Sequence, residues 1–224
     1  IITEFTPNRT LKNVIEIENM KHSTNLDDTK KLINIYGIAS GMLYLHSLGI
    51  LHRNLKLENI LLDANLLPKI SEFGYSTIIG QDKIDFNYLF EYSAPEVFQG
   101  EYSKSSEVYS FAIIVYEIMS NKEIFKGYSI AKIQEEIMKG FRPQLSEKIP
   151  KVYRNLIEKC WSQNPNNRPT FNEIVNHLKT NHEFITESIK QEDFHRYIDI
   201  VDKYKINIEA LNKNEIKNDE KSTK

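Results

Sequence analysis

The chain has 224 residues, of which 40% are hydrophobic and 27% are charged, and its net charge is −2. This composition is typical of a soluble globular protein, and the near-neutral charge gives no electrostatic basis for binding nucleic acid. The single cysteine, Cys160, excludes an internal disulfide framework and favours a reducing compartment, which we take to be the cytoplasm. No apolar run approaches the roughly 18 residues that a membrane span needs, so we expect no contact with a membrane.

The first part of the chain predicts a short strand followed by two helices. The strand is IITEF, residues 1–5, and it ends at the turn residues Pro7 and Asn8. Apolar residues at helical spacing predict a short helix over 11–20 and a longer one over 29–48. Asp28 is a candidate N-cap for the longer helix, and Gly49 is placed to end it in a left-handed conformation.

The rest of the chain predicts one hairpin and then mostly helix. Apolar runs predict two short strands, and a nearly continuous apolar stretch predicts a buried helix. Amphipathic helices follow it, and a further helical pattern should pack its apolar face on the rest of the chain, with partner binding as the less favoured alternative. The last residues are nearly all polar and predict disorder. The ranges are 60–62 and 69–71 for the strands, 106–121 for the buried helix, 129–139, 151–161 and 170–179 for the amphipathic helices, 181–208 for the further helical pattern and 209–224 for the tail.

The stretch from His52 to Gly74 resembles the catalytic core of a protein kinase. The family pattern is H-R-D-L-x-x-x-N, followed after a short strand pair by D-F-G. His52, Arg53 and Asn59 match the first motif at the right spacing, and Phe73 and Gly74 match the end of the second.

The two aspartates of that pattern are replaced in this chain. Asn54 stands at the position of the family's catalytic aspartate, and Glu72 at that of its magnesium-binding aspartate. The resemblance implies that Lys56 and Asn59 keep their catalytic positions and that Asn59 and Glu72 are the metal ligands. It also implies that Leu61 packs beneath adenine, for which simple core packing is the alternative.

The beginning of the chain resembles the segment that joins the two lobes of a kinase. By this resemblance Thr3 is the gatekeeper, and Glu4, Phe5 and Thr6 supply hinge groups for adenine. The alternative for these residues is an ordinary edge strand.

Four residues further along carry expectations from the same resemblance. The sequence YSAPE ends at Glu96, which in the family pairs with an arginine, here Arg168; a solvated loop arginine is the alternative. Glu107 replaces the aspartate that anchors the catalytic-loop backbone. Leu89 stands where many members have a threonine that hydrogen-bonds the catalytic aspartate and lysine, and an aliphatic side chain cannot make those bonds.

The expected fold is therefore mainly α, the helical large lobe of an α+β protein-kinase-like fold with short β-hairpins. The chain contains no G-x-G-x-x-G loop to cover phosphates and does not begin with Met, so we expect a fragment without the small lobe. The expected divisions are a remnant of the small-lobe strand and hinge over 1–7, the large lobe over 8–180, a helical extension over 181–208 and a disordered charged tail over 209–224.

These features favour a pseudokinase or truncated kinase that acts as a binding or regulatory module. A protein partner is expected, and an active kinase that this chain scaffolds or regulates fits best. The helix over 106–121 and the CW-x6-RP segment resemble those of tyrosine-kinase-like serine/threonine kinases. ATP and magnesium are the cofactors that the resemblance implies, and we expect weak or no binding. Two alternatives stay open: a serine/threonine kinase of low activity once a small lobe is supplied, and a truncated product without stable function.

Overall fold

The structure, a computed structural model, describes residues 8–21, 26–81 and 90–204 of the chain. Most of these residues are helical, as the sequence predicts, and the strands are short. The helices are α1 (Leu11–Lys21), α2 (Asp28–Ser47), α3 (Lys104–Ser120), α4 (Ile130–Met138), α5 (Lys151–Cys160) and α6 (Phe171–Thr180), with a further helix over 191–204. The strands are β1 (Asn8–Thr10), β2 (Ile50–Leu51), β3 (Ile60–Leu62), β4 (Pro68–Ile70) and β5 (Thr77–Ile78).

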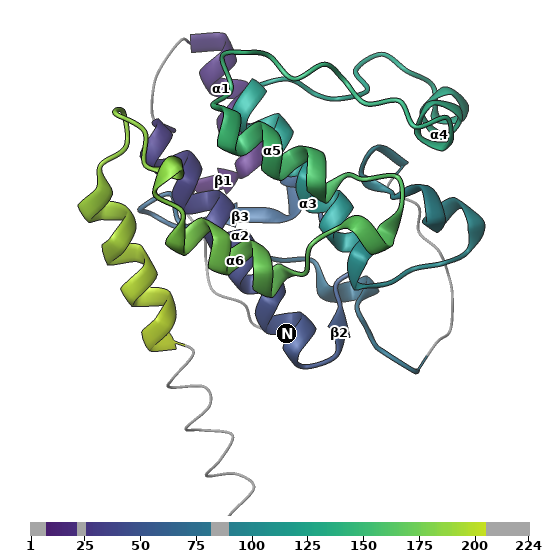
Figure 1. Cartoon of the computed structure of the whole chain (residues 1–224), viewed down its shortest axis with the longest axis horizontal. Coiled ribbons are helices and arrows are strands. Elements are labelled where there is room, and N and C mark those ends of the chain that lie inside the picture. The colour runs from purple at the N-terminus through teal and green to yellow at the C-terminus, as the bar shows by residue number, and fades with distance from the viewer. Residues whose placement is uncertain (1–7, 22–25, 82–89, 205–224) are drawn as a thin grey trace, which may run out of the picture.

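Two central helices, α2 and α3, organise the core (Figure 1). α6 packs on α2, and α5 packs on α3, so that each central helix is covered by a helix from later in the chain. α3 is buried on all sides from Ser106 to Ile118, as its nearly continuous apolar sequence predicts. Within the described ranges, no helix has both the length and the apolar character needed to cross a membrane.

The ends of α2 show where local sequence signals succeed and fail. The prediction of Asp28 as N-cap is wrong, because the cap is Asp27, whose side chain accepts a hydrogen bond from the Lys30 N–H at 2.8 Å. Asp28 is instead the first helical residue. At the other end Gly49 adopts the predicted left-handed conformation, with φ of 70°.

The strands form two small sheets around the loop that follows β2. In the first sheet β3 lies between β1 and β4, and all neighbours are antiparallel. In the second, β2 pairs with β5, so the chain before the loop is joined to the chain after Gly74. Two predictions need correction: Asn8 begins a strand instead of a turn, and the second hairpin strand begins at Pro68, one residue earlier than expected.

The C-terminal extension is not the continuous helix that the sequence predicts. A 3₁₀ turn at His182–Phe184 is followed by irregular chain, and helix begins again only at residue 191. This last helix runs along the flank of α2 (Figure 1), where Phe194 packs edge to face on Tyr36 with ring centroids 5.5 Å apart. The predicted packing of the extension on the rest of the chain is therefore confirmed. The tail over 209–224 lies outside the described residues.

Candidate functional site

The loop between β2 and β3 is anchored by Glu107, a fully buried carboxylate on α3. Its Oε1 accepts a hydrogen bond from the backbone N–H of Arg53 at 2.7 Å, and its Oε2 lies 2.6 Å from Nε2 of His46. Arg53 has a left-handed φ of 63°, a conformation that costs a non-glycine residue on the order of 1–3 kcal/mol. The bond to Glu107 offsets part of that cost, so glutamate in the aspartate position still holds the loop backbone.

His52 connects this loop to the segment that carries Glu72. Burial lowers the pKa of His52, so the ring is neutral at pH 7 and holds one proton. Its Nε2 lies 2.8 Å from the backbone carbonyl of Ser71, which can only accept, so the proton is on Nε2. Nδ1 is then free to accept a hydrogen bond from the Asn54 N–H at 3.3 Å. The ring also contacts Phe73 edge to face, at a centroid distance of 5.0 Å.

Asn54 and Asn59 are brought together inside the loop, and both are buried. Nδ2 of Asn59 donates a hydrogen bond to the backbone carbonyl of Asn54 at 2.6 Å, and the Asn59 N–H donates to the Lys56 carbonyl at 3.0 Å. The carbonyl of Asn59 accepts from both the N–H and the Oγ of Ser71, each at 2.9 Å. The side-chain amide of Asn59 therefore braces the loop and leaves its Oδ1 as an available oxygen ligand.

Glu72 is exposed and follows Ser71 directly, with left-handed φ and ψ of 65° and 56°. Phe73 and Gly74 then enter a short 3₁₀ turn. The chain returns to the loop at once, because Ser76 Oγ donates to the His52 carbonyl at 3.2 Å. The backbone around Glu72 is thus fixed to the loop on both sides while the residue itself is open to solvent.

Asn59 and Glu72 fit a magnesium ion that is bound mainly by phosphate and water. Magnesium usually keeps several waters and takes only one or two carboxylates together with substrate phosphates. In the part of the chain that the structure describes, no group of three or more His, Cys, Asp or Glu residues could hold a metal ion. An amide oxygen and one carboxylate are suitable donors, and the phosphates would have to supply much of the remaining binding.

The residues predicted to contact adenine are only partly described. Leu61 is half-buried in β3, opposite Thr10 of β1 and Lys69 of β4, a position that agrees with core packing and leaves the adenine contact a prediction. The other predicted residues of this region, and the position of the family's threonine, lie outside the described residues: Thr3, Glu4, Phe5, Thr6 and Leu89.

The buried ion pair expected between Glu96 and Arg168 is present. Two parallel hydrogen bonds join them, Nη1 to Oε1 at 2.6 Å and Nη2 to Oε2 at 2.9 Å. Ser106 Oγ donates to the same carboxylate at 2.9 Å. Two guanidinium groups lie over the Tyr109 ring, that of Arg168 5.2 Å and that of Arg142 4.9 Å from its centroid. Sequence reasoning missed Ser106 and Tyr109, although both lie in the helix that it predicted to be buried.

Sequence reasoning also missed a buried carboxylate, Glu117, near the end of α3. Its Oε2 accepts from the Tyr92 hydroxyl at 2.7 Å, and its Oε1 accepts from the Ile124 N–H at 3.3 Å. Burial raises the pKa of Glu117 to about 7, against the opposing effect of these hydrogen bonds. Glu117 also lines a pocket of about 550 Å³ together with Leu57 of the loop. A group that titrates near neutral pH therefore lies beside the site.

Replacing Glu117 by glutamine is expected to make the protein less sensitive to pH. The fold binds the Glu117 proton more tightly than the unfolded chain does, since the pKa is about 7 when folded and 4.5 otherwise. The stabilisation is complete at pH values under 4.5 and is lost as the pH rises to about 7. Urea unfolding should show Glu117→Gln more stable than the native chain by up to roughly 3 kcal/mol at high pH, with little difference at low pH. A difference that stays constant across this range would contradict the assignment.

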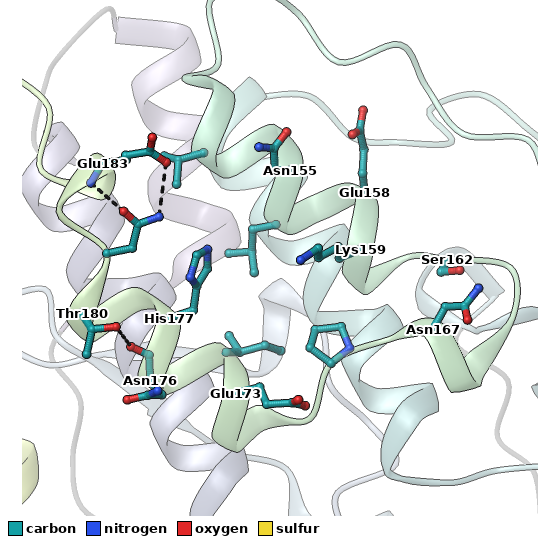
Figure 2. A pocket seen from close by; sticks show the side chains of 15 residues that line it. Asn155, Glu158, Lys159, Ser162, Asn167, Glu173, Asn176, His177, Thr180 and Glu183 are labelled. Atoms are coloured by element: carbon teal, nitrogen blue, oxygen red, sulfur yellow. Dashed lines mark hydrogen bonds between the residues drawn. The ribbon is translucent and has the colours of Figure 1, made fainter.

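A pocket of about 810 Å³ lies elsewhere, between α5 and α6 (Figure 2). None of the residues predicted for the site lines it. Part of its polar lining is satisfied locally: Thr180 Oγ1 donates to the Asn176 carbonyl at 2.8 Å, and Asn181 and Glu183 bond to each other (Figure 2). This pocket gives no argument for a chemical function.

Comparison with known proteins decides which family this geometry represents. The sequence model of the family described as "Protein tyrosine and serine/threonine kinase" matches residues 1–178. The chain belongs to this protein kinase family. Within this kinase chain, the match includes the loop, the Glu72 segment and the Glu96–Arg168 pair, and it ends before the extension that packs on α2.

Two curated relatives from Dictyostelium discoideum illustrate the similarity. The RGS domain-containing serine/threonine-protein kinase A is 39% identical over 158 residues, which are 70% of this kinase chain and 14% of the relative. The dual specificity protein kinase pyk3 is 34% identical over 183 residues, which are 80% of this chain and 13% of the relative. The chain thus spans about a seventh of the length of these relatives.

Proposed function

We propose that this kinase lobe acts by binding another protein and that its phosphoryl-transfer chemistry is impaired, as in a pseudokinase. The observation that carries the proposal is the contrast within one loop. Glu107 holds the Arg53 backbone, and Asn59 braces the loop, so the architecture is maintained. At the position of the catalytic base, however, the loop presents Asn54, whose neutral amide cannot take up a proton in the working pH range.

The expected loss of phosphoryl-transfer rate is large enough to distinguish a binding protein from an enzyme. General-base catalysis is typically worth roughly 10²–10⁴-fold in rate. Glu72 keeps a carboxylate, but its extra methylene shifts the oxygens, and a misplacement of about 1 Å can cost on the order of 10²-fold. Residues that act together do not contribute independently, so these factors give only the scale of the loss.

Members of this family generally use ATP and magnesium, and the proposal for this chain is weak or no binding. Asn59 and Glu72 are the residues that would hold magnesium, and Leu61 would lie beneath adenine. When bound, magnesium neutralises charge on the transferred phosphate. The chain's own loop would orient a substrate hydroxyl through the side-chain Oδ1 of Asn54, without accepting its proton.

A serine/threonine kinase of low activity is the second candidate. The names of the curated relatives favour it, and so does the presence of Lys56, Asn59 and a carboxylate at Glu72. This candidate requires the small-lobe parts of a kinase, a Gly-rich loop and a strand lysine, and the 224 residues contain no G-x-G-x-x-G sequence.

The partner that we propose is a protein, with an active kinase that the lobe scaffolds or regulates as the favoured case. Nucleic acid and membrane partners are not proposed, because the net charge is −2 and no helix within the described residues is long and apolar enough to cross a membrane. We propose a cytoplasmic location, in keeping with a single cysteine, Cys160, which is buried as a free thiol.

Nucleotide titration tests the binding part of this proposal. Adding Mg-ATP to 1 mM should leave the melting temperature of the chain unchanged, whereas a site with a Kd near 10 μM would add roughly 2.7 kcal/mol of stability. The matched control is Glu72→Ala, which removes the exposed carboxylate proposed as a magnesium ligand. A clear stabilisation of the native chain that Glu72→Ala abolishes would contradict the proposal and support the enzyme.

A further inference from the structure

The C-terminal extension lies outside the residues matched by the kinase family and is nevertheless tied to the start of α2. The Ser188 hydroxyl donates a hydrogen bond to Asp28 Oδ2 at 2.6 Å, and the Lys190 N–H donates to Thr29 Oγ1 at 2.9 Å. Phe184 is fully buried against the Tyr153 ring, with centroids 5.0 Å apart. These contacts fix the chain just before the helix over 191–204.

That helix then packs along α2 through two aromatic side chains. Phe194 and Tyr197 both meet Tyr36, at centroid distances of 5.5 Å and 6.2 Å, and in each case the rings are edge to face. Phe194 and Tyr36 are almost completely buried. A salt bridge of 2.6 Å between Lys179 and Asp202 joins α6 to the later part of the helix.

A glycine on α2 creates the slot that Tyr197 enters. A Cβ on Gly37 would collide with the Tyr197 hydroxyl and with Pro68, the first residue of β4. Because both groups occupy the space next to Gly37, the extension and β4 meet there. One turn further on, a Cβ on Gly41 would lie 2.7 Å from Cδ1 of Ile70, so β4 itself packs closely on α2.

β4 leads directly to the residues that face the loop. Ile70 is followed by Ser71, whose carbonyl accepts from His52 and whose N–H and Oγ both donate to the Asn59 carbonyl. Glu72 comes next. Only three residues separate Pro68 from Glu72, and two of them are fixed in β4, so a contact at Pro68 can act on the position of Glu72.

We propose that the extension braces the β3–β4 hairpin, and that Tyr197 is the positioning residue through which the helix over 191–204 keeps Ser71 and Glu72 against the loop. The helix over 191–204 covers one flank of the molecule (Figure 1), and from it Tyr197 reaches the space beside Gly37 of α2 and Pro68 of β4. It operates whether or not the lobe transfers phosphate, so it goes beyond the proposed function and does not depend on it.

Hydrogen exchange of the whole chain, followed by mass spectrometry and NMR, tests the brace. In Tyr197→Ala, the amides of residues 62–67 and 69–71 should exchange roughly tenfold faster, and the amide signals of Ser71 and Glu72 should shift. Gly37→Ala should have at least the same effect, because its Cβ collides with both the Tyr197 hydroxyl and Pro68. Tyr197→Phe loses the hydroxyl but keeps the ring against Tyr36 and its edge beside Gly37, so its exchange should stay much closer to native than that of Tyr197→Ala.

The matched control is Tyr204→Ala, on the same helix but with a side chain that is 66% exposed. It should leave the hairpin unchanged. If exchange in Tyr197→Ala rises only in the extension, or rises equally in all helices, Tyr197 does not position the hairpin and the proposal is wrong. If Gly37→Ala or Tyr197→Ala fails to fold, Tyr197→Leu takes its place, because leucine keeps apolar bulk but cannot reach Gly37. Faster exchange in the hairpin would then support the proposal. Faster exchange only in the extension, or equally in all helices, would contradict it.

Discussion

Replacing Arg168 by alanine is expected to lower the free energy of unfolding by roughly 3–5 kcal/mol. The substitution leaves the Glu96 carboxylate buried without its cation, and it also removes a guanidinium group from the Tyr109 ring. The chain should show a much lower melting temperature and a lower urea midpoint, and its soluble yield should fall.

The double variant Glu96→Gln with Arg168→Met is the matched control for this loss. It removes both charges together, and replacing a buried pair by groups of similar volume is often close to neutral. It should therefore be more stable than Arg168→Ala, and a double-mutant cycle should give a clear coupling energy. An Arg168→Ala variant within about 0.5 kcal/mol of the native chain would mean that the pair contributes nothing.

Helices and their faces could be predicted from the sequence because their signals are local. The stripe in α2 and the left-handed Gly49 depend only on residues near each other in the chain. The choice between Asp27 and Asp28 as N-cap could not be made locally, since both residue types cap helices well and only the backbone geometry decides. The predicted range of β4 is one residue too late for a similar reason. Ser71 lies outside the strand, because it bonds to His52 and Asn59.

The break in the helix of the C-terminal extension shows a different limit of prediction from sequence. Its apolar residues follow a helical pattern with no strong breaker, so a continuous helix was the natural prediction. The hydrogen bonds that hold the break come from α2, where Asp28 and Thr29 meet Ser188 and Lys190, and those partners are 160 and 161 residues apart in sequence. No local pattern contains that information.

The candidate site likewise combines features that the sequence predicts with contacts that it does not. Motif spacing placed Asn54, Asn59 and Glu72 in one region, and the structure brings Asn54 and Asn59 into direct contact. The contact of Glu107 with His46 spans 61 residues, and no spacing rule pointed to it. The resemblance implies the Glu96–Arg168 pair, whereas no local pattern indicates that Arg142 and Arg168 both lie over the Tyr109 ring.

Restoring the two family aspartates is expected to convert this lobe into an active kinase when a small lobe is present. A chimera with the small lobe of an active relative should be nearly inactive as it stands. Asn54→Asp combined with Glu72→Asp should raise the rate of protein phosphorylation by up to roughly 10⁴-fold, because the base and the metal geometry return together. Adding Leu89→Thr should raise it further if the family's threonine bonds are needed.

The initial rate of protein phosphorylation by the unmodified chimera, measured beside the Asn54→Asp, Glu72→Asp chimera, tests the central claim most directly. The impaired-chemistry account predicts that the restored chimera approaches the usual kinase range of about 1–100 s⁻¹ and that the unmodified one stays several orders of magnitude slower. Turnover of the unmodified chimera within that range would contradict the account, and Asn54 and Glu72 would then be working catalytic residues.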